Sequence, residues 1–310
     1  MYNTISFPGL GIGEITINPN IISIGNLSIK WYAVLICIGI LVAFFYCQHK
    51  CDYFKISKDD FLDILLFALP IGFVGARIAY VLGDIESFNS FYDVIAVWNG
   101  GLAIYGGVIA AAITVICVCK FKKINFLSVL DLMGIGLLIG QIIGRLGNFF
   151  NVEVYGIETT LPWRMGVGYN GISEYVHPLF MYEILWNIIG LVLILGYLDL
   201  RKFKGEVFLW YVAWYGLGRG MLEPLRDTQY NLHLFGVRIN MVLAFASCAA
   251  AIILIIVFRL RSKSFITAKK VVDVNYEPQF ESLMDKPEEN DENNDVILET
   301  EKENENGSDN

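Results

Sequence analysis

Charged side chains are scarce in this sequence. They make up 17% of the 310 residues, whereas hydrophobic residues make up 55%. An average soluble domain carries about 25% charged residues, so this balance excludes an ordinary water-soluble fold and predicts an integral membrane protein. The formal net charge of -8 does not describe the apolar body, because fourteen acidic residues lie beyond position 270.

Cysteine and histidine motifs that hold metals or disulfides are missing. The three histidines, His49, His177 and His233, are widely separated and form no HExxH motif, so neither a catalytic metal nor another cofactor is expected. The cysteines form no CxxC pair and have no histidine at zinc spacing. We interpret them as small packing residues rather than disulfide partners or zinc ligands. The six are Cys37, Cys47, Cys51, Cys117, Cys119 and Cys248.

The two ends of the chain lack the features of a signal peptide and of a packed core. The first 20 residues contain no basic segment followed by an apolar one, so a cleaved signal peptide is not expected. Residues 271–310 are rich in Glu, Asp and Asn, a composition that cannot offset the entropy of ordering. We therefore expect a seven-helix transmembrane domain at 1–270 and a disordered, acidic, cytoplasmic tail at 271–310.

The sequence does contain seven long apolar stretches. A helix of about 20 apolar residues crosses a bilayer, and the candidates lie at 31–48, 61–82, 102–119, 126–147, 178–198, 206–221 and 237–258. Alternate connections carry fourteen lysines and arginines on one side and four on the other. Because cytoplasmic loops are enriched in these residues, we predict an all-α membrane protein of seven transmembrane helices, with its N-terminus outside and its C-terminus in the cytoplasm.

Ionisable residues gather at the predicted outer ends of the spans, and the inner ends carry nothing comparable. Such a group at membrane depth costs about +2.5–3.5 kcal/mol, so a fold that retains several is expected to use them. The strongest run is GRLGNFFNVEVYG at 144–156. It also fits a simpler role, in which one arginine and two asparagines cap a helix at the interface.

A second polar set follows a helical period. Tyr215, Arg219 and Glu223 are spaced by four, so they share one face of the sixth predicted span. Arg226 lies three residues further on, beyond Pro224, and its place on or off that face is left open. One outward-facing polar cavity is expected to hold both sets of residues.

The run at 144–156 resembles the signature GRxGNFxNxExxG of the bacterial prolipoprotein diacylglyceryl transferase family. Other segments match that family in order, namely KWY at 30–32, GARIAY at 75–80, WNGGLAIYGG at 98–107, His177-Pro178, Tyr182-Glu183 and YGLGR at 215–219. The resemblance implies an enzyme that moves the diacylglyceryl group of phosphatidylglycerol onto the lipobox cysteine thiol of lipoprotein precursors. A thioether forms and glycerol phosphate leaves, as the first step of lipoprotein maturation.

The resemblance also implies a location and a set of roles. The enzyme would lie in the bacterial cytoplasmic membrane with its active site toward the extracytoplasmic side. Arg145 and Arg219 would be the essential arginines, which suits the planar guanidinium as a partner of phosphate oxygens. Glu153 and Glu223 would orient these guanidinium groups. Substrate-binding candidates are Arg145, Asn148, Asn151, Gly156, Tyr32, Arg77, His177, Glu183, Tyr215 and Arg226; Arg77 and Arg226 fit equally well as anchors to interfacial lipid phosphates.

Two residues, Tyr105 and His177, are considered as the base that would take the proton of the reacting thiol. Many family members carry a histidine before Gly-Gly in the third-span motif, where this chain has Tyr105. Tyr105 fits a positioning role, hydrogen-bonding phosphate or ester, better than base catalysis. His177 is an alternative proton acceptor, or it caps the start of the fifth span. Tyr32 lies where an interfacial aromatic belt would also place a tyrosine.

Two other functions fit a membrane protein with these arginines. A transporter or channel for an anionic solute would bind its substrate with them, but the sequence shows no internal repeat and nothing comparable to this polar set on the cytoplasmic side. A structural or receptor-like protein would use the polar run for helix packing, which does not explain several arginines in one half of the bilayer. The transferase is therefore favoured.

Overall fold

A computed structural model of the protein describes residues 3–24, 27–88, 90–97, 100–169, 171–226, 233–234 and 237–274. Residues 1–259 form one compact unit, and residues 260–310 are assigned to a second. In the second unit the described part, 260–274, is helical. Two predictions fall outside the described residues: the disorder expected for most of the tail, from 275 on, and the contribution of Trp98 and Asn99 to the motif at 98–107.

The described chain is mostly helical, and each predicted span coincides with a helix. The long helices are α1 (Trp31–Lys50), α2 (Lys58–Gly83), α4 (Ile104–Lys122), α5 (Phe126–Asn151), α6 (Leu179–Tyr197), α7 (Glu206–Leu222) and α8 (Ile239–Val274). Six of them are long and apolar enough to cross a membrane. The exception is α7, which has 17 residues. The prediction of a multi-span helical membrane protein is confirmed at this level.

The helices begin where the sequence offers caps. The Ser57 side chain accepts a hydrogen bond from the Asp60 amide at 3.0 Å at the start of α2. At the start of α5, Asn125 Oδ1 accepts from the Ser128 amide at 3.1 Å. These side chains satisfy amides that have no partner inside their own helix, so both boundaries follow from local sequence.

Small residues bring α2 and α4 together. A Cβ atom added to Gly75 would lie 2.3 Å from the Cβ of Ala110, and one added to Gly106 would lie 2.2 Å from the Cβ of Ala79. Membrane helices approach closely through small residues of this kind. The pair α2 and α4 therefore packs as a unit, and α2 runs unbroken through Pro70.

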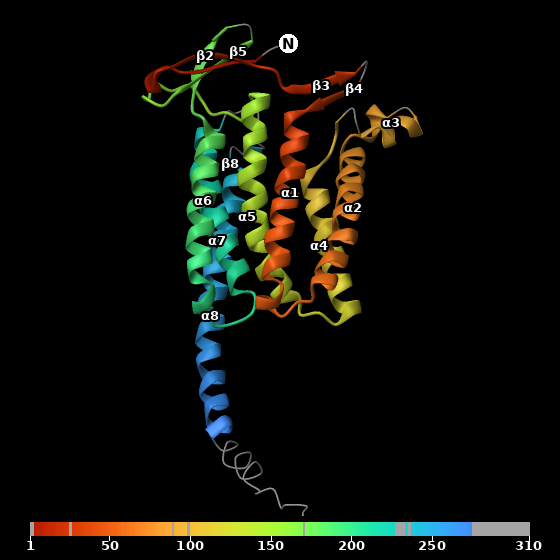
Figure 1. Ribbon diagram of the computed structural model, residues 1–310, viewed down its shortest axis with the longest axis vertical. Coiled ribbons are helices and arrows are strands. Elements are labelled where there is room, and N and C mark those ends of the chain that lie inside the picture. Colours follow the sequence, from red (N-terminus) through yellow and green to blue (C-terminus); the bar gives the residue numbers. More distant parts are fainter. Residues whose placement is uncertain are drawn as a thin grey trace, which may run out of the picture. The chain divides into compact units, whose positions relative to one another are not determined.

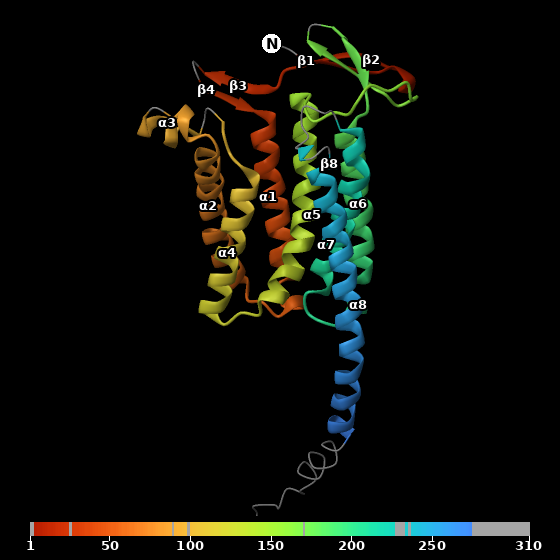
Figure 2. The same cartoon turned by 180° about the vertical axis from the view of Figure 1, so that it is seen from behind.

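The other helices of the first unit are arranged around α5. It packs against α1, α6 and α7, while α6 and α7 also contact each other. Figure 1 shows α1 between α5 and the α2–α4 pair, and Figure 2 gives the same order from behind. Because α5 carries residues 144–151 of the run at 144–156 on its last turns, this part of the run is placed between α1 on one side and α6 and α7 on the other.

Strands, which the all-α prediction did not include, form at one end of the helices. An antiparallel sheet has the order β2-β1-β5-β6, and two hairpins pair β3 with β4 and β7 with β8. The strands are β1 (Asn3–Phe7), β2 (Ile12–Ile17), β3 (Asn20–Ile24), β4 (Leu27–Lys30), β5 (Met165–Tyr169), β6 (Glu174–Val176), β7 (His233–Leu234) and β8 (Val237–Arg238). We call this end of the unit the sheet end.

Short helical turns complete the connections. They are α3 (Phe91–Ile95) and the 3-10 turns η1 (Pro8–Leu10), η2 (Asp52–Phe54), η3 (Ile85–Ser87), η5 (Leu198–Leu200) and η6 (Glu223–Leu225). The sheet is tied to α5 through Asn3, whose side-chain amide donates to the carbonyls of Phe150 at 3.3 Å and Asn151 at 3.2 Å. These two hydrogen bonds therefore attach the last turn of α5 to strand β1 of the sheet.

The opposite end carries the lysine-bearing connections and a buried polar network. Asp131 and Glu206 are fully buried there. Asp131 accepts from the amides of Gly205 at 2.8 Å and Phe208 at 3.0 Å, and Glu206 pairs with Arg259 Nε at 2.5 Å. The expectation that the inner ends carry nothing comparable is therefore wrong. These carboxylates cap α7 and join α5, α7 and α8, so their role is structural.

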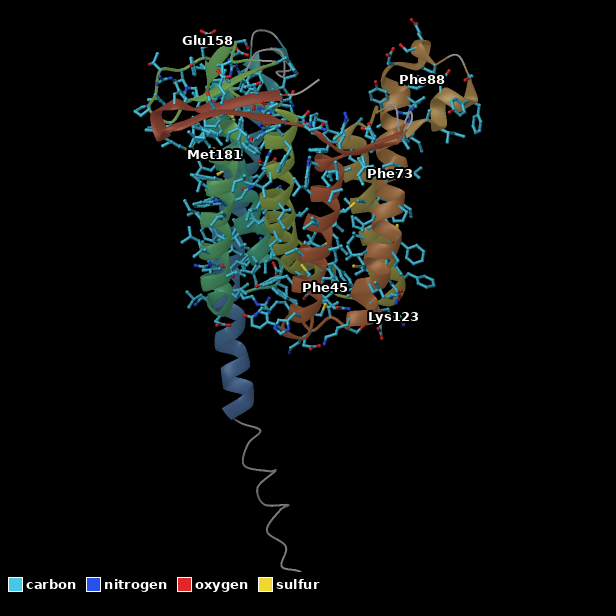
Figure 3. All side chains as sticks on the ribbon, turned by 45° about the horizontal axis from the view of Figure 1, so that its top comes forward. Phe45, Phe73, Phe88, Lys123, Glu158 and Met181 are labelled. Atoms are coloured by element: carbon cyan, nitrogen blue, oxygen red, sulfur yellow. The ribbon has the colours of Figure 1, made fainter. Side chains whose placement is uncertain are left out.

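The sides of the helical body are apolar, as a bilayer requires. Phe45 and Phe73 are 62% and 48% exposed, and Figure 3 shows them on α1 and α2 between the two ends, with Glu158 near one end and Lys123 near the other. A soluble protein would bury such side chains. Their exposure agrees with a surface that faces lipid.

Candidate active site

Three arginines converge on one buried carboxylate at the sheet end. Glu183, in the second turn of α6, has Oε1 3.0 Å from Nη2 of Arg226 and 3.7 Å from Nη1 of Arg219. Its Oε2 pairs with Nε of Arg145 on α5. A predicted substrate-binding residue is thus the centre of the cluster, and it joins α5, α6 and the end of α7.

A second carboxylate completes this cluster. Glu223 is fully buried, and its Oε2 lies 3.0 Å from Nη2 of Arg219 and 3.8 Å from Nε of Arg226. The shared helix face predicted for Arg219 and Glu223 is confirmed by this contact. Arg226, whose place was open, follows the 3-10 turn at Glu223–Leu225 and joins the cluster.

The run at 144–156 forms a hydrogen-bonded row beside the arginines. Arg145 Nη1 donates to Asn148 Oδ1 at 3.2 Å, and Asn148 Nδ2 donates to Glu153 Oε1 at 3.1 Å. Asn151 donates to the same Glu153 oxygen at 3.2 Å. This row holds Nη1 of Arg145 while Glu183 pairs with its Nε, so the motif positions its own arginine in addition to capping α5.

The backbone around Glu153 is strained. Val152 and Val154 have φ angles of 50° and 58°, in the left-handed region that β-branched residues rarely adopt. Such conformations cost about 1–3 kcal/mol each and persist where the surroundings impose them. Here they turn the chain sharply at the end of α5 and direct the Glu153 carboxylate back to the two asparagines.

Gly156 lies where backbones from three segments meet. Its amide donates to the His177 carbonyl at 2.9 Å, and the next amide, of Ile157, donates to the Leu225 carbonyl at 2.9 Å. A Cβ at Gly156 would lie 2.6 Å from the Leu225 oxygen and 2.8 Å from the Cβ of His177. Only glycine fits, and the contact holds the Glu223–Arg226 segment beside the run at 144–156.

Two predicted tyrosines border the cluster. Tyr32, at the start of α1, packs on Gly147 of α5, where an added Cβ would lie 2.5 Å from the ring. Tyr215, one turn before Arg219 on α7, stacks on Tyr211 with ring centroids 6.0 Å apart. Tyr32 therefore packs on the helix that carries Arg145, and Tyr215 lines a small pocket together with Glu183 and Arg219.

Tyr105 and Arg77 make their polar contacts elsewhere. The Tyr105 ring is 64% exposed, and its hydroxyl donates to Asn240 Oδ1 at 3.2 Å. Arg77 is buried, and its guanidinium donates to five backbone carbonyls between Asp93 and Gly101 at 2.7–3.5 Å. The observed contacts of Arg77 therefore hold the connection that leads into α4.

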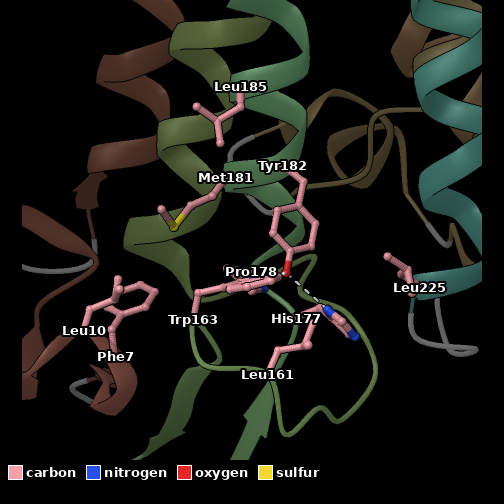
Figure 4. A pocket seen from close by; sticks show the side chains of 10 residues that line it. All are labelled: Phe7, Leu10, Leu161, Trp163, His177, Pro178, Met181, Tyr182, Leu185 and Leu225. Atoms are coloured by element: carbon pink, nitrogen blue, oxygen red, sulfur yellow. Dashed lines mark hydrogen bonds between the residues drawn. The ribbon is translucent and has the colours of Figure 1, made fainter.

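His177 faces a separate apolar pocket of about 460 Å³ under the sheet. Its Nδ1 lies 3.2 Å from the Tyr182 hydroxyl, which accepts a hydrogen bond from Trp163 Nε1 at 2.7 Å. Figure 4 shows these rings at the pocket with Met181 and Leu185 on the helix behind them. Burial lowers the pKa of His177 below its usual value, so the ring is neutral at pH 7. The His177 ring also meets the Tyr182 ring edge-on, with centroids 6.0 Å apart.

The cluster has the properties of an anion-binding site. Three guanidinium groups contact two carboxylates, Glu183 and Glu223, which leaves a positive excess. Nη1 of Arg219 is buried and has no hydrogen-bond partner among the described residues. Burial, followed by the charge of Arg219, lowers the pKa of Arg226, but an arginine stays protonated at neutral pH. A phosphate would supply the missing acceptor and balance the charge.

Two residues near the cluster were not singled out from the sequence. Arg238, counted only as a loop charge, donates from Nη1 to the Glu223 carbonyl at 2.6 Å. Gln141 lies one turn before Arg145 on α5 and donates to the Tyr211 hydroxyl at 3.0 Å. Gln141 could have been recognised from its four-residue spacing from Arg145, which puts both on one helix face. No neighbouring residue in the sequence indicates that Arg238 contacts the cluster.

The fold and the site together define a multi-pass membrane protein with a buried, arginine-rich anion site at one end of its helices. The family model of prolipoprotein diacylglyceryl transferase matches residues 19–257. This chain belongs to that family.

Named relatives cover most of the chain. The phosphatidylglycerol–prolipoprotein diacylglyceryl transferase of Lactobacillus delbrueckii subsp. bulgaricus is 37% identical over 263 residues, which are 80% of this chain and 94% of the relative. That of Listeria welshimeri is 36% identical over 263 residues, 81% and 94% of the two chains. The transferase 1 of Clostridium perfringens is 35% identical over 256 residues, 79% and 96%.

Proposed function

We propose that this protein transfers the diacylglyceryl group of phosphatidylglycerol to the lipobox cysteine thiol of lipoprotein precursors. Family membership and the names of the relatives support this assignment. The observation that carries it is the Glu183-centred cluster, in which a buried Arg219 nitrogen lacks a hydrogen-bond partner among the described residues. A phosphodiester is the anionic group that such a site would hold.

In the proposed reaction, the substrate supplies the nucleophile. The cysteine sulfur attacks the glyceryl carbon that bears the phosphate ester, a C–S bond forms, and the C–O bond to phosphate breaks. The negative charge that develops on the leaving phosphate is stabilised by Arg145 and Arg219, which Glu183 and Glu223 hold in place. The thiol proton goes to the departing glycerol phosphate, whose second pKa is about 6. Tyr105 is assigned a positioning role at the start of α4.

The proposed placement is in the bacterial cytoplasmic membrane. There α7 is the sixth of seven spans; its 17 residues reach about 25 Å at 1.5 Å per residue, slightly less than the 30 Å hydrocarbon core. The lysine-bearing connections lie in the cytoplasm, and the sheet end, with the active site, faces outward. This orientation is supported by the asymmetry of lysine and arginine between the two sets of connections.

The direct test is an assay of the purified protein in detergent. Phosphatidylglycerol and a synthetic signal peptide with a lipobox cysteine are supplied, and release of glycerol phosphate is measured together with the mass of the peptide. We expect release and a diacylglyceryl mass gain in equal amounts. Neither signal from folded protein, together with anion uptake in vesicles, would favour the transporter instead.

Arg145→Ala and Arg219→Ala are expected to abolish transfer, with a loss of at least about 10²-fold in turnover, because each removes a charge aimed at the leaving phosphate. The matched control is Arg164→Ala. Arg164 lies at the same end, and its guanidinium donates to the backbone carbonyls of Thr160 and Leu161 rather than to a carboxylate of the cluster. Full activity in either cluster variant would disprove the phosphate-binding role of that arginine.

A further inference from the structure

A second cavity lies within the helices, between α1, α2 and α5. Its volume is about 330 Å³. Ile36 and Ile40 of α1, Leu65 and Leu69 of α2, and Met133 of α5 line it, and Gln141 supplies a polar group. Apart from that amide, its walls are hydrocarbon, glycine and one cysteine, so its occupant must be apolar.

The cavity continues toward the arginine cluster along α5. Gln141 precedes Arg145 by one turn, so both lie on one face of the helix. A Cβ atom added to Gly140 or Gly144 would meet no atom within 4 Å, which shows open space beside α5 at both positions. On α1, Tyr32 precedes Ile36 by one turn in the same way. Both walls therefore lead from the cavity to the proposed phosphate site.

The distance matches one lipid chain. From Arg145 to Met133 is twelve residues, or about 18 Å along the helix at 1.5 Å per residue. One leaflet contributes about 15 Å, half of the 30 Å hydrocarbon core. A transmembrane signal-peptide helix, about 10–12 Å across, is too wide for a cavity of about 330 Å³. A single acyl chain is narrow enough.

We propose that this cavity holds one acyl chain of the donor phospholipid, and that Met133 and the contact of Gly136 with Cys47, at its deep end, determine which chain lengths fit. The inference rests on the proposed function, because the phosphate at Arg145 fixes where the chain begins. A Cβ at Gly136 would lie 2.9 Å from Cys47 Sγ, so α1 and α5 close the deep end there.

Gln141 adds a polar contact at the depth of the ester groups. Its Oε1 is buried and has no hydrogen-bond partner within the described part of the chain, while Nε2 donates to Tyr211. Rotating the amide by half a turn lets Oε1 accept the Tyr211 hydroxyl proton and frees Nε2 to donate to an ester carbonyl. A bound lipid therefore satisfies both ends of this amide.

The test is a change in chain-length preference. Met133→Trp fills the deep end of the cavity, and turnover is compared for phosphatidylglycerol with two C8 chains and with two C16 chains. We expect the ratio of kcat/KM for C16 over C8 to fall about tenfold, the order of effect that methylene-sized changes have in apolar pockets. The matched control is Leu193→Trp, because Leu193 on α6 is exposed and does not line the cavity.

Equal losses with both donors, or an unchanged ratio, would overturn the proposal. An equal loss accompanied by a higher KM for the peptide would assign the cavity to the peptide substrate. Absence of transfer by the wild-type protein would instead contradict the proposed function. Photo-crosslinking with phosphatidylglycerol that carries a diazirine at the end of one acyl chain then tests lipid binding in the cavity without relying on transfer activity. Crosslinks to Met133 or Cys47 support the proposal, and crosslinks confined to other helices refute it.

Discussion

At the scale of single residues, the site depends on one carboxylate that pairs with three arginines. Glu183 lies within 4 Å of Arg145, Arg219 and Arg226, so it fixes the directions of all three guanidinium groups. We predict that Glu183→Gln lowers kcat about 10²-fold, the effect of a misplacement of about 1 Å, with a smaller change in the KM for lipid. Steady-state kinetics with phosphatidylglycerol and signal peptide measure this.

Glu158→Gln is the control for that variant, because Glu158 is an exposed carboxylate at the same end of the molecule. It should leave both constants unchanged. Glu183→Asp should recover part of the kcat, since it restores the charge on a shorter side chain. If Glu183→Gln works at the wild-type rate, the three arginines hold their positions without it, and its central role is incorrect.

At the scale of elements, α7 is held from a neighbouring helix. Its first amides are satisfied by Asp131 of α5, which accepts from Gly205 and Phe208. We predict that Asp131→Asn lowers the stability of the protein by about 1–2 kcal/mol, as loss of a helix cap does, because the amide has one acceptor oxygen instead of two. Thermal unfolding in detergent should show a lower midpoint.

Asp52→Asn is the control for that variant, because it makes the same change at a carboxylate that is 79% exposed and whose charged partner, Lys58, lies 3.8 Å away. Exposed pairs of this kind contribute about 0–1 kcal/mol, so its midpoint should equal that of the wild type. Equal midpoints for Asp131→Asn and Asp52→Asn would mean that the cap on α7 is not needed for stability.

At the scale of the whole molecule, the charges of the connections predict its orientation. Single-cysteine reporters at Glu14 in the sheet and at Lys123 between α4 and α5 are placed in a background that lacks the native cysteines. In right-side-out vesicles, a membrane-impermeant maleimide should label Glu14→Cys directly and Lys123→Cys only after permeabilisation. The opposite pattern would invert the orientation and place the arginine cluster toward the cytoplasm.

Local signals explain which features could be predicted from the sequence. Each predicted span is a continuous apolar stretch, so the seven long helices were found, and the largest differences lie at the ends, as for α8. Arg145, Arg219, Glu183 and Glu223 were found because charges at membrane depth are rare. The run at 144–156 was found because its polar residues are consecutive. In each case the information lies within a few residues of the feature.

Contacts between distant segments explain what could not be predicted. Strand β1 pairs with β5, where Ile5 faces Val167, and strands this short have no pattern that foretells a partner so far away. The contacts of Arg77 with the carbonyls of the connection into α4 were not foreseen, because those carbonyls lie 16–24 residues away along the chain. Asp131 and Glu206 were not noticed because their partners are amides and side chains from other helices.

The sequence by itself determined the membrane class, the helices and the residue types of the site, because hydrophobic length and intramembrane charge are properties of the chain alone. Only the tertiary structure decided that Glu183 is the centre of the cluster, that Arg226 belongs to it, and that a cavity lies between α1, α2 and α5. Those features arise where helices distant in sequence pack together, and the direction of a side chain there is set by its neighbours rather than by its own segment.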